Sequence, residues 1–207
     1  MRDSVSHSRD SCVVTIMERE IELRLVARLK TGDAAAFEAV YEAFRARLYS
    51  FLVRLSRRRD VAEDLLEETW LRFVARARDL RPDTCLAAWL FTVARNLHAS
   101  WCRNRALHDE RLSDLTPSWP AAARGETPFE ATARTETERR LETALARLTL
   151  RDRVVLLLVA IDELTPSEAA ASLGLTPEVL RKRLQRARER LALEMAAELA
   201  SPQAKAG

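Results

Sequence analysis

A dense basic run near the C-terminus is the strongest sign of chemistry in the sequence. Residues 181 to 190 contain a single acid, Glu189, against six basic side chains: Arg181, Lys182, Arg183, Arg186, Arg188 and Arg190. At 100° per residue, the apolar side chains of a helix here share one face, formed by Leu180, Leu184, Ala187 and Leu191. A helix that is apolar behind and basic in front suits the major groove of DNA, although charge runs can also be simple solvated faces.

The residues before this run contain two helix starts separated by a short turn. Thr165 and Pro166 form a helix start, and Glu168 lies three residues after the cap, which is the spacing of a capping box. Gly174 ends that helix, and Thr176 with Pro177 begins the next one. Two helices joined by a short glycine turn are typical of a helix-turn-helix, which favours DNA binding over a merely solvated face. The second helix would display its candidate DNA-contacting side chains: Glu178, Arg181, Lys182, Gln185 and Arg186.

An acidic stretch in the first half of the chain suits a different partner. Residues 60 to 68 include Asp60, Glu63, Asp64, Glu67 and Glu68 and no basic residue. If the apolar positions around Leu65 and Phe73 turn inward, the outer side of the helix carries Asp64, Glu67, Glu68 and Leu71. An acidic face with one exposed leucine suits docking on a protein, and a solvated face is the alternative.

The sequence contains no constellation that predicts catalysis. There is no phosphate-binding glycine loop, and His7, His98 and His108 have no evident nucleophile partner, so we expect neither an enzyme nor a cofactor. His98 and Cys102 have the spacing of two ligands on one helix, and Cys85 could add a third. Packed side chains explain these residues better than a metal or redox centre, so we predict no metal site.

The elements that must position these residues are helical. The chain has 207 residues with only four glycines and is rich in Ala, Leu, Arg and Glu, which predicts an all-α fold. We expect two small helical domains joined by a flexible linker. The boundaries are an arm at 1–17, a four-helix domain at 18–108, a linker at 109–137, a helix-turn-helix domain at 138–199 and a tail at 200–207. A relaxed linker of this length would span roughly 30 Å.

Cysteine usage and hydropathy suggest where the chain works. Cys12, Cys85 and Cys102 are widely spaced and odd in number, which is not a disulfide framework and favours a reducing compartment. No stretch approaches the roughly 18 to 20 apolar residues that would cross a bilayer. We therefore expect a cytoplasmic protein without membrane insertion.

Stretches in two separate parts of the chain resemble one protein family. Residues 165 to 190 look like region 4.2 of extracytoplasmic-function sigma factors, including the run Arg181-Lys182-Arg183-Leu184-Gln185-Arg186. Ala62-Glu63-Asp64-Leu65-Leu66-Glu67-Glu68-Thr69-Trp70-Leu71-Arg72-Phe73 resembles region 2.2, and Ala88-Trp89-Leu90-Phe91-Thr92-Val93-Ala94-Arg95-Asn96 resembles regions 2.3 and 2.4. The resemblance implies a transcription initiation factor whose first domain binds core RNA polymerase at the β′ coiled coil and captures the −10 element. The second domain would read the −35 element, and an anti-sigma protein is a further expected partner.

The resemblance leaves the promoter sequence open. The −10 candidates are Asp83 and Thr84 in the loop from 79 to 85, chosen by position, and Arg95 and Asn96, which could contact nucleic acid or pair within the domain. Trp89 is assigned to the core. Glu178 could accept from a cytosine amino group or only favour the helix N-terminus. The rival function is a helix-turn-helix regulator whose N-terminal helical domain senses a signal.

Overall fold

The structure is a computed structural model that describes residues 19–113, 135–161 and 164–200. Within these ranges every regular element is a helix, so the all-α prediction is confirmed. The predicted arm at 1–17, most of the predicted linker and most of the tail lie outside the described residues. None of the described helices combines the length and apolar character needed to cross a membrane.

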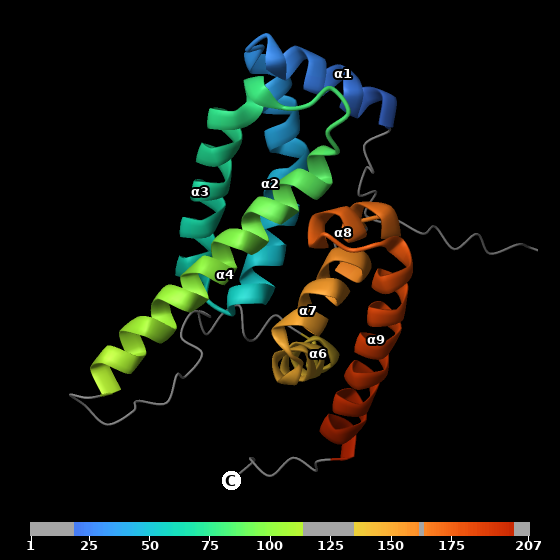
Figure 1. Cartoon of the computed structure of the whole chain (residues 1–207). Helices are drawn as coiled ribbons and strands as arrows, with labels where there is room; N and C mark the ends of the chain where they lie inside the picture. The colour runs from blue at the N-terminus through green and yellow to red at the C-terminus, as the bar shows by residue number, and fades with distance from the viewer. Residues whose placement is uncertain (1–18, 114–134, 162–163, 201–207) are drawn as a thin grey trace, which may run out of the picture.

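The first half of the chain folds into four helices, which Figure 1 shows from blue to yellow-green. They are α1 (Arg19–Lys30), α2 (Ala34–Ser56), α3 (Arg59–Arg76), followed by the 3₁₀ turn η1 (Ala77–Asp79), and α4 (Leu86–Ser113). In the turn before α2, Gly32 adopts a φ of 79° and the Asp33 side chain accepts a hydrogen bond from the amide of Ala35 at 2.9 Å, which caps α2. α4 continues past the predicted domain boundary at 108 through residues 109 to 113.

Large aromatic side chains fill the centre of this four-helix unit. Phe44, Phe51, Phe73 and Phe91 are at most 2% exposed and come from α2, α3 and α4. The rings of Phe51 and Phe91 meet edge to face with centroids 5.2 Å apart, which ties α2 to α4. Trp89 is half-buried against Phe73 at 5.7 Å, in agreement with its assignment to the core.

The second half contains α6 (Glu136–Arg147), α7 (Leu150–Leu156), the π-helical turn η2 (Leu157–Ile161), α8 (Pro166–Leu173) and α9 (Pro177–Ala200). The long α9, red in Figure 1, packs along α6 and α7, and α8 packs against α9 and η2. Thr135 caps α6 with a full capping box, so the first helix of this unit begins slightly before the predicted boundary at 138.

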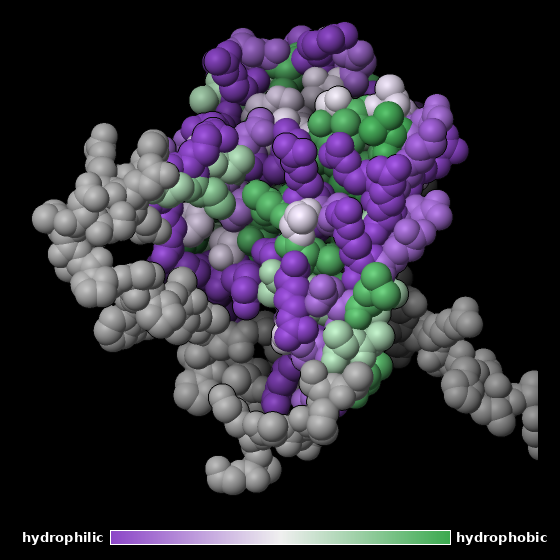
Figure 2. Space-filling view, turned by 60° about the horizontal axis from the view of Figure 1, so that its bottom comes forward, coloured by the Kyte–Doolittle hydropathy of each residue, from purple (hydrophilic) through white to green (hydrophobic). Residues whose placement is uncertain are grey.

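The two halves pack directly on one another along α4 and α8. The Thr92 hydroxyl donates to the backbone carbonyl of Ser172 at 3.1 Å, and Arg54 of α2 pairs with Glu142 of α6 at 3.2 Å. Their buried apolar side chains form one continuous cluster from Leu25 to Ala187. Hydrophilic side chains cover much of the face in Figure 2, with smaller hydrophobic patches between them.

Candidate nucleic-acid interface and protein-docking groove

The helix-turn-helix is built by the caps that its sequence predicts. The Thr165 hydroxyl accepts from the amide of Glu168 at 3.3 Å, and the Glu168 carboxylate accepts from the amide of Thr165 at 2.8 Å. Gly174 then ends α8 in the left-handed region with a φ of 63°. The Thr176 hydroxyl accepts from the amide of Val179 at 3.3 Å and starts α9. These local contacts fix the angle at which α9 leaves α8.

The two faces of α9 separate as the periodicity predicts. Leu180, Leu184 and Ala187 are at most 8% exposed and pack inward. All five predicted DNA-contacting side chains are exposed on the other side: Glu178, Arg181, Lys182, Gln185 and Arg186. The arrangement therefore presents a basic surface that is fixed from behind by an apolar one.

Several of these exposed side chains already have partners on the helix. Lys182 pairs with Glu178, its Nζ lying 3.0 Å from the carboxylate oxygen, and Gln185 donates to Glu189 at 3.1 Å. Among the described residues neither Arg181 nor Arg186 has a carboxylate within ion-pair distance, but the Arg181 Nε donates to the backbone carbonyl of Pro177 at 3.3 Å. Of the candidate set, Arg186 is thus the guanidinium most available to a phosphate or a base.

The −10 candidates lie in the loop between α3 and α4 and on α4 itself. Asp83 is exposed and Thr84 is half-buried, and the amide of Thr84 closes a turn by donating to the carbonyl of Arg81 at 3.0 Å. Arg95 donates to the Asn96 side-chain oxygen at 2.9 Å, so these two residues pair with each other in this structure. Partial burial lowers the pKa of Arg95.

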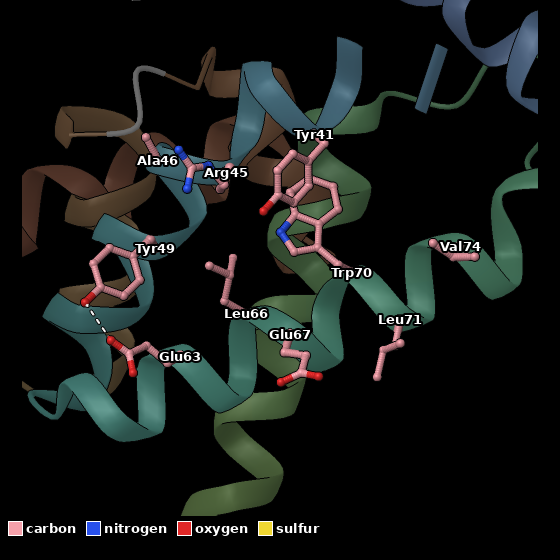
Figure 3. A pocket seen from close by; sticks show the side chains of 10 residues that line it. All are labelled: Tyr41, Arg45, Ala46, Tyr49, Glu63, Leu66, Glu67, Trp70, Leu71 and Val74. Atoms are coloured by element: carbon pink, nitrogen blue, oxygen red, sulfur yellow. Dashed lines mark hydrogen bonds between the residues drawn. The ribbon is translucent and has the colours of Figure 1, made fainter. Parts of the chain in front are cut away.

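An apolar groove lies between α2 and α3, beside the predicted acidic face. It encloses about 620 Å³ and is lined mainly by Tyr41, Tyr49, Leu66, Trp70, Leu71 and Val74. Figure 3 shows Tyr41 of α2 beside Trp70 of α3, whereas the Tyr49 hydroxyl donates to the Glu63 carboxylate at 3.5 Å. Arg45 and Glu67 also border the space. Leu71 and Val74 are each 57% exposed at its edge. Such a hollow with a charged rim suits an amphipathic partner helix.

The structure divides the four residues predicted to bind polymerase. Glu67 and Leu71 line the groove, whereas Glu68 pairs with Arg72 at 2.8 Å on the surface, and Asp64 is exposed without lining the groove. Sequence reasoning missed the contribution of α2. The spacing of Tyr41, Arg45 and Tyr49 at i, i+4 and i+8 was the available signal, but it identifies a groove only once α3 is known to lie beside it.

His98 and the two described cysteines do not assemble into a metal site. The Sγ of Cys102 lies 3.7 Å from His98 Nε2, but Cys85 is elsewhere, 3.5 Å from the Glu168 carboxylate. In the described part of the chain, no group of three or more His, Cys, Asp or Glu side chains could hold a metal ion. His98 is 3% exposed, and its burial lowers its pKa to about 4, with the charge of Arg153 adding to the effect. Burial raises the pKa of the Cys85 thiol to about 12.

Comparison with known proteins matches both halves of the chain. The family model described as Sigma-70 region 2 matches residues 40–107, and the one described as Sigma-70, region 4 matches residues 138–191. The ECF RNA polymerase sigma factor EcfG of Rhodopseudomonas palustris is 34% identical over 144 residues, which cover 70% of this chain and 76% of that protein. The RNA polymerase sigma factor CarQ of Myxococcus xanthus is 29% identical, covering 79% of this chain and 91% of its own length.

Solved structures share the fold. CnrH in complex with the cytosolic domain of CnrY superposes with a TM-score of 0.65 at 21% identity, over 87% of this chain and 99% of the other. The sigma factor RpoE of Bartonella quintana, in complex with the anti-sigma factor NepR, gives 0.62 at 24% identity, over 77% of this chain and 96% of the other. With both regions matched in order and a curated relative of this similarity, the chain belongs to the extracytoplasmic-function (ECF) family of RNA polymerase sigma factors.

Proposed function

We propose that this sigma factor divides promoter recognition between two DNA-reading surfaces and one polymerase-docking groove. As a member of its family it is a transcription initiation factor that directs RNA polymerase to promoters. The proposal concerns which residues do so in this chain. The observation that carries it is the pairing of a basic, capped α9 with a separate apolar groove on α2 and α3.

In this proposal the exposed side of α9 reads the −35 element. Arg186 contacts bases or phosphates directly, and Arg181 and Gln185 add contacts beside it. Lys182 and Glu178 act as a pair, because the ion pair between them has to open before either can contact a base. The domain formed by residues 138–199 therefore serves as the duplex reader.

The domain formed by residues 18–108 binds the polymerase and the melted strand. We assign the groove between α2 and α3, with Glu67 and Leu71, to the β′ coiled coil of core polymerase. Asp64 contributes negative potential from outside the groove, and Glu68 contributes to core binding once its ion pair with Arg72 opens. The loop bearing Asp83 and Thr84, with Arg95 and Asn96 on α4, is assigned to the −10 element. No residue is assigned to catalysis, and the protein acts in the cytoplasm, where the polymerase is.

The contact between α4 and α8 has a consequence for this division. By their names the two promoter elements lie about 25 base pairs apart, or roughly 85 Å along B-DNA. If α4 and α9 each bind their own element, α8 must leave α4, and the hydrogen bond from Thr92 to the Ser172 carbonyl must break. The packed form described here then corresponds to the factor before promoter binding.

An anti-sigma protein is part of the proposal. Two solved relatives with this fold are bound to such a partner or to a cytosolic domain of another protein. The groove on α2 and α3 is an apolar surface of the described residues that suits an inhibitory helix. A partner seated there would exclude polymerase by occupying the same side chains.

Transcription reconstituted from purified components tests the proposal. Core polymerase and this chain are combined with genomic DNA fragments, and the 5′ ends of the transcripts are mapped. We expect starts at a small set of promoters that share two upstream elements and that core polymerase alone does not use. Equal transcription without the chain, or starts lacking shared elements, would leave the helix-turn-helix regulator as the better explanation.

A further inference from the structure

The first described helix, α1, contacts the loop that we assign to the −10 element. Arg19 lies at the start of α1 and donates to the backbone carbonyls of Asp83 at 2.7 Å and Thr84 at 3.3 Å. Lys30, at the other end of α1, donates to the carbonyl of Leu80 at 3.1 Å. Contacts from both ends of α1 therefore hold the loop between α3 and α4. In Figure 1 it lies across the end of the four-helix unit, beside the connection from α3 to α4.

A buried carboxylate links α1 to the start of α4. Glu22 is 4% exposed, and its Oε1 accepts from the amide of Leu86 at 2.5 Å. That amide is the first of α4 and has no partner within its own helix. Helix N-termini are usually capped by Ser, Thr, Asp or Asn, and Cys85 stands at that place here. The second oxygen of Glu22 accepts from Arg19 at 2.5 Å, so one network joins the cap and the loop.

The other charged side chains of α1 do not contact this connection, and Arg28 pairs with Asp33 in the turn before α2 at 2.8 Å. Arg24 pairs with Glu20, and both side chains are at least 73% exposed on the outer side of the helix. The match to Sigma-70 region 2 begins at residue 40, so α1 lies outside the segment in which the family was detected. The apolar side of α1, with Leu25, Val26 and Leu29, packs into the core against α2, whereas Arg19, Glu22 and Lys30 form hydrogen bonds with the connection between α3 and α4 and with the first residue of α4.

We propose that α1 is a positioning element for −10 recognition, in which Glu22 fixes the start of α4 and Arg19 holds the Asp83 and Thr84 carbonyls. The inference rests on the proposed assignment of this loop to the −10 element. Arg19 and Glu22 do not touch DNA. They hold the backbone so that the Asp83 and Thr84 side chains meet an unstacked base without further ordering.

Binding of holoenzyme to fork-junction DNA measures this role. The fork carries, in single-stranded form, the −10 bases of a promoter that the reconstituted transcription has identified. We expect Arg19→Ala to weaken fork binding about tenfold, because it removes both hydrogen bonds to the loop carbonyls, and solvent exposure limits each of them to a factor of about three. Arg19→Lys, which can reach one carbonyl, should retain part of the affinity. The matched control Arg24→Ala should bind as wild type, and affinity for core polymerase and for −35 duplex should not change in any variant.

The charge of Glu22 provides a second readout at Cys85. Burial is the main reason that the pKa of the Cys85 thiol is high, and the Glu22 carboxylate raises it further. Glu22→Gln keeps an acceptor for the Leu86 amide but removes the charge. We expect Cys85 of this variant to be alkylated faster than in the wild type, as measured by peptide mass spectrometry with Cys102 as internal reference. We also expect weaker fork binding, because Arg19 loses the carboxylate that holds its guanidinium in place.

Substitutions in the loop and substitutions in α1 test the loop assignment and the positioning role separately. If Asp83→Ala and Thr84→Ala weaken fork binding but Arg19→Ala and Glu22→Gln do not, the positioning role is wrong and the loop assignment stands. If the loop variants leave fork binding unchanged, the loop is not the −10 reader and the inference falls with it. An equal loss of −35 duplex binding in Arg19→Ala would indicate general damage to the fold and would also overturn the inference.

Discussion

Leu71 offers a quantitative test of the docking groove. Its side chain is 57% exposed at the edge of the groove, beside Trp70 and Val74. Complete burial of a leucine side chain is worth about 1.5 to 3 kcal/mol, so burying the exposed part on docking contributes about 0.9 to 1.7 kcal/mol. Alanine retains the Cβ methyl, and we therefore expect Leu71→Ala to weaken core binding by about 1 kcal/mol, or about fivefold in Kd.

The assay is a fluorescence titration of labelled sigma factor with core polymerase. Leu193 serves as the matched control, because it is a leucine of α9 that is 71% exposed and does not line the groove. Leu193→Ala should leave Kd unchanged, and thermal unfolding should show little change in either variant, since neither side chain is buried. The groove assignment is refuted if Leu71→Ala binds core as tightly as wild type, or if Leu193→Ala loses as much affinity.

Three further predictions concern α9, the turn before it and His98. Glu178→Gln releases Lys182 and removes a negative charge, so non-specific duplex binding should tighten and the salt dependence of log K should steepen by about one. The Cβ atom added by Gly174→Ala meets no atom within 4 Å, so the substitution is disfavoured only by the left-handed backbone conformation. Urea unfolding should show that the free energy of unfolding falls by about 1 to 2 kcal/mol, and by less for Gly174→Asn. Because burial lowers the pKa of His98 from 6.5 to about 4, its contribution to stability is complete above pH 6.5 and is lost as the pH falls toward 4, up to about 3 kcal/mol. His98→Gln should flatten that pH dependence of unfolding.

Local signals made the helix-turn-helix predictable from the sequence. The caps at Thr165 and Thr176 and the left-handed Gly174 depend on residues within one turn, and each is found where the sequence places it. The faces of α9 follow from helical periodicity alone, and Leu180 is fully buried as expected. The exposed acidic side of α3 followed in the same way.

Features that need two elements in a defined register were not predictable. The groove requires Tyr41 and Tyr49 of α2 beside Leu66 and Trp70 of α3. The sequence of neither helix indicates which helix packs against it. The contact of Thr92 with Ser172 joins residues 80 positions apart in the chain. Glu22 accepts from the amide of Leu86, which lies 64 positions later in the chain. Tertiary packing, which periodicity does not encode, decides all three.

The central claim is that polymerase binding and promoter reading reside on separate surfaces. The most direct measurement compares Leu71→Asp and Arg186→Ala in two titrations, one with core polymerase and one with −35 duplex DNA. A charge in the apolar groove should abolish core binding by Leu71→Asp and leave its duplex affinity at the wild-type value, whereas Arg186→Ala should lose duplex affinity by about 1 to 3 kcal/mol and bind core normally. Parallel losses of both activities in either variant would contradict the division.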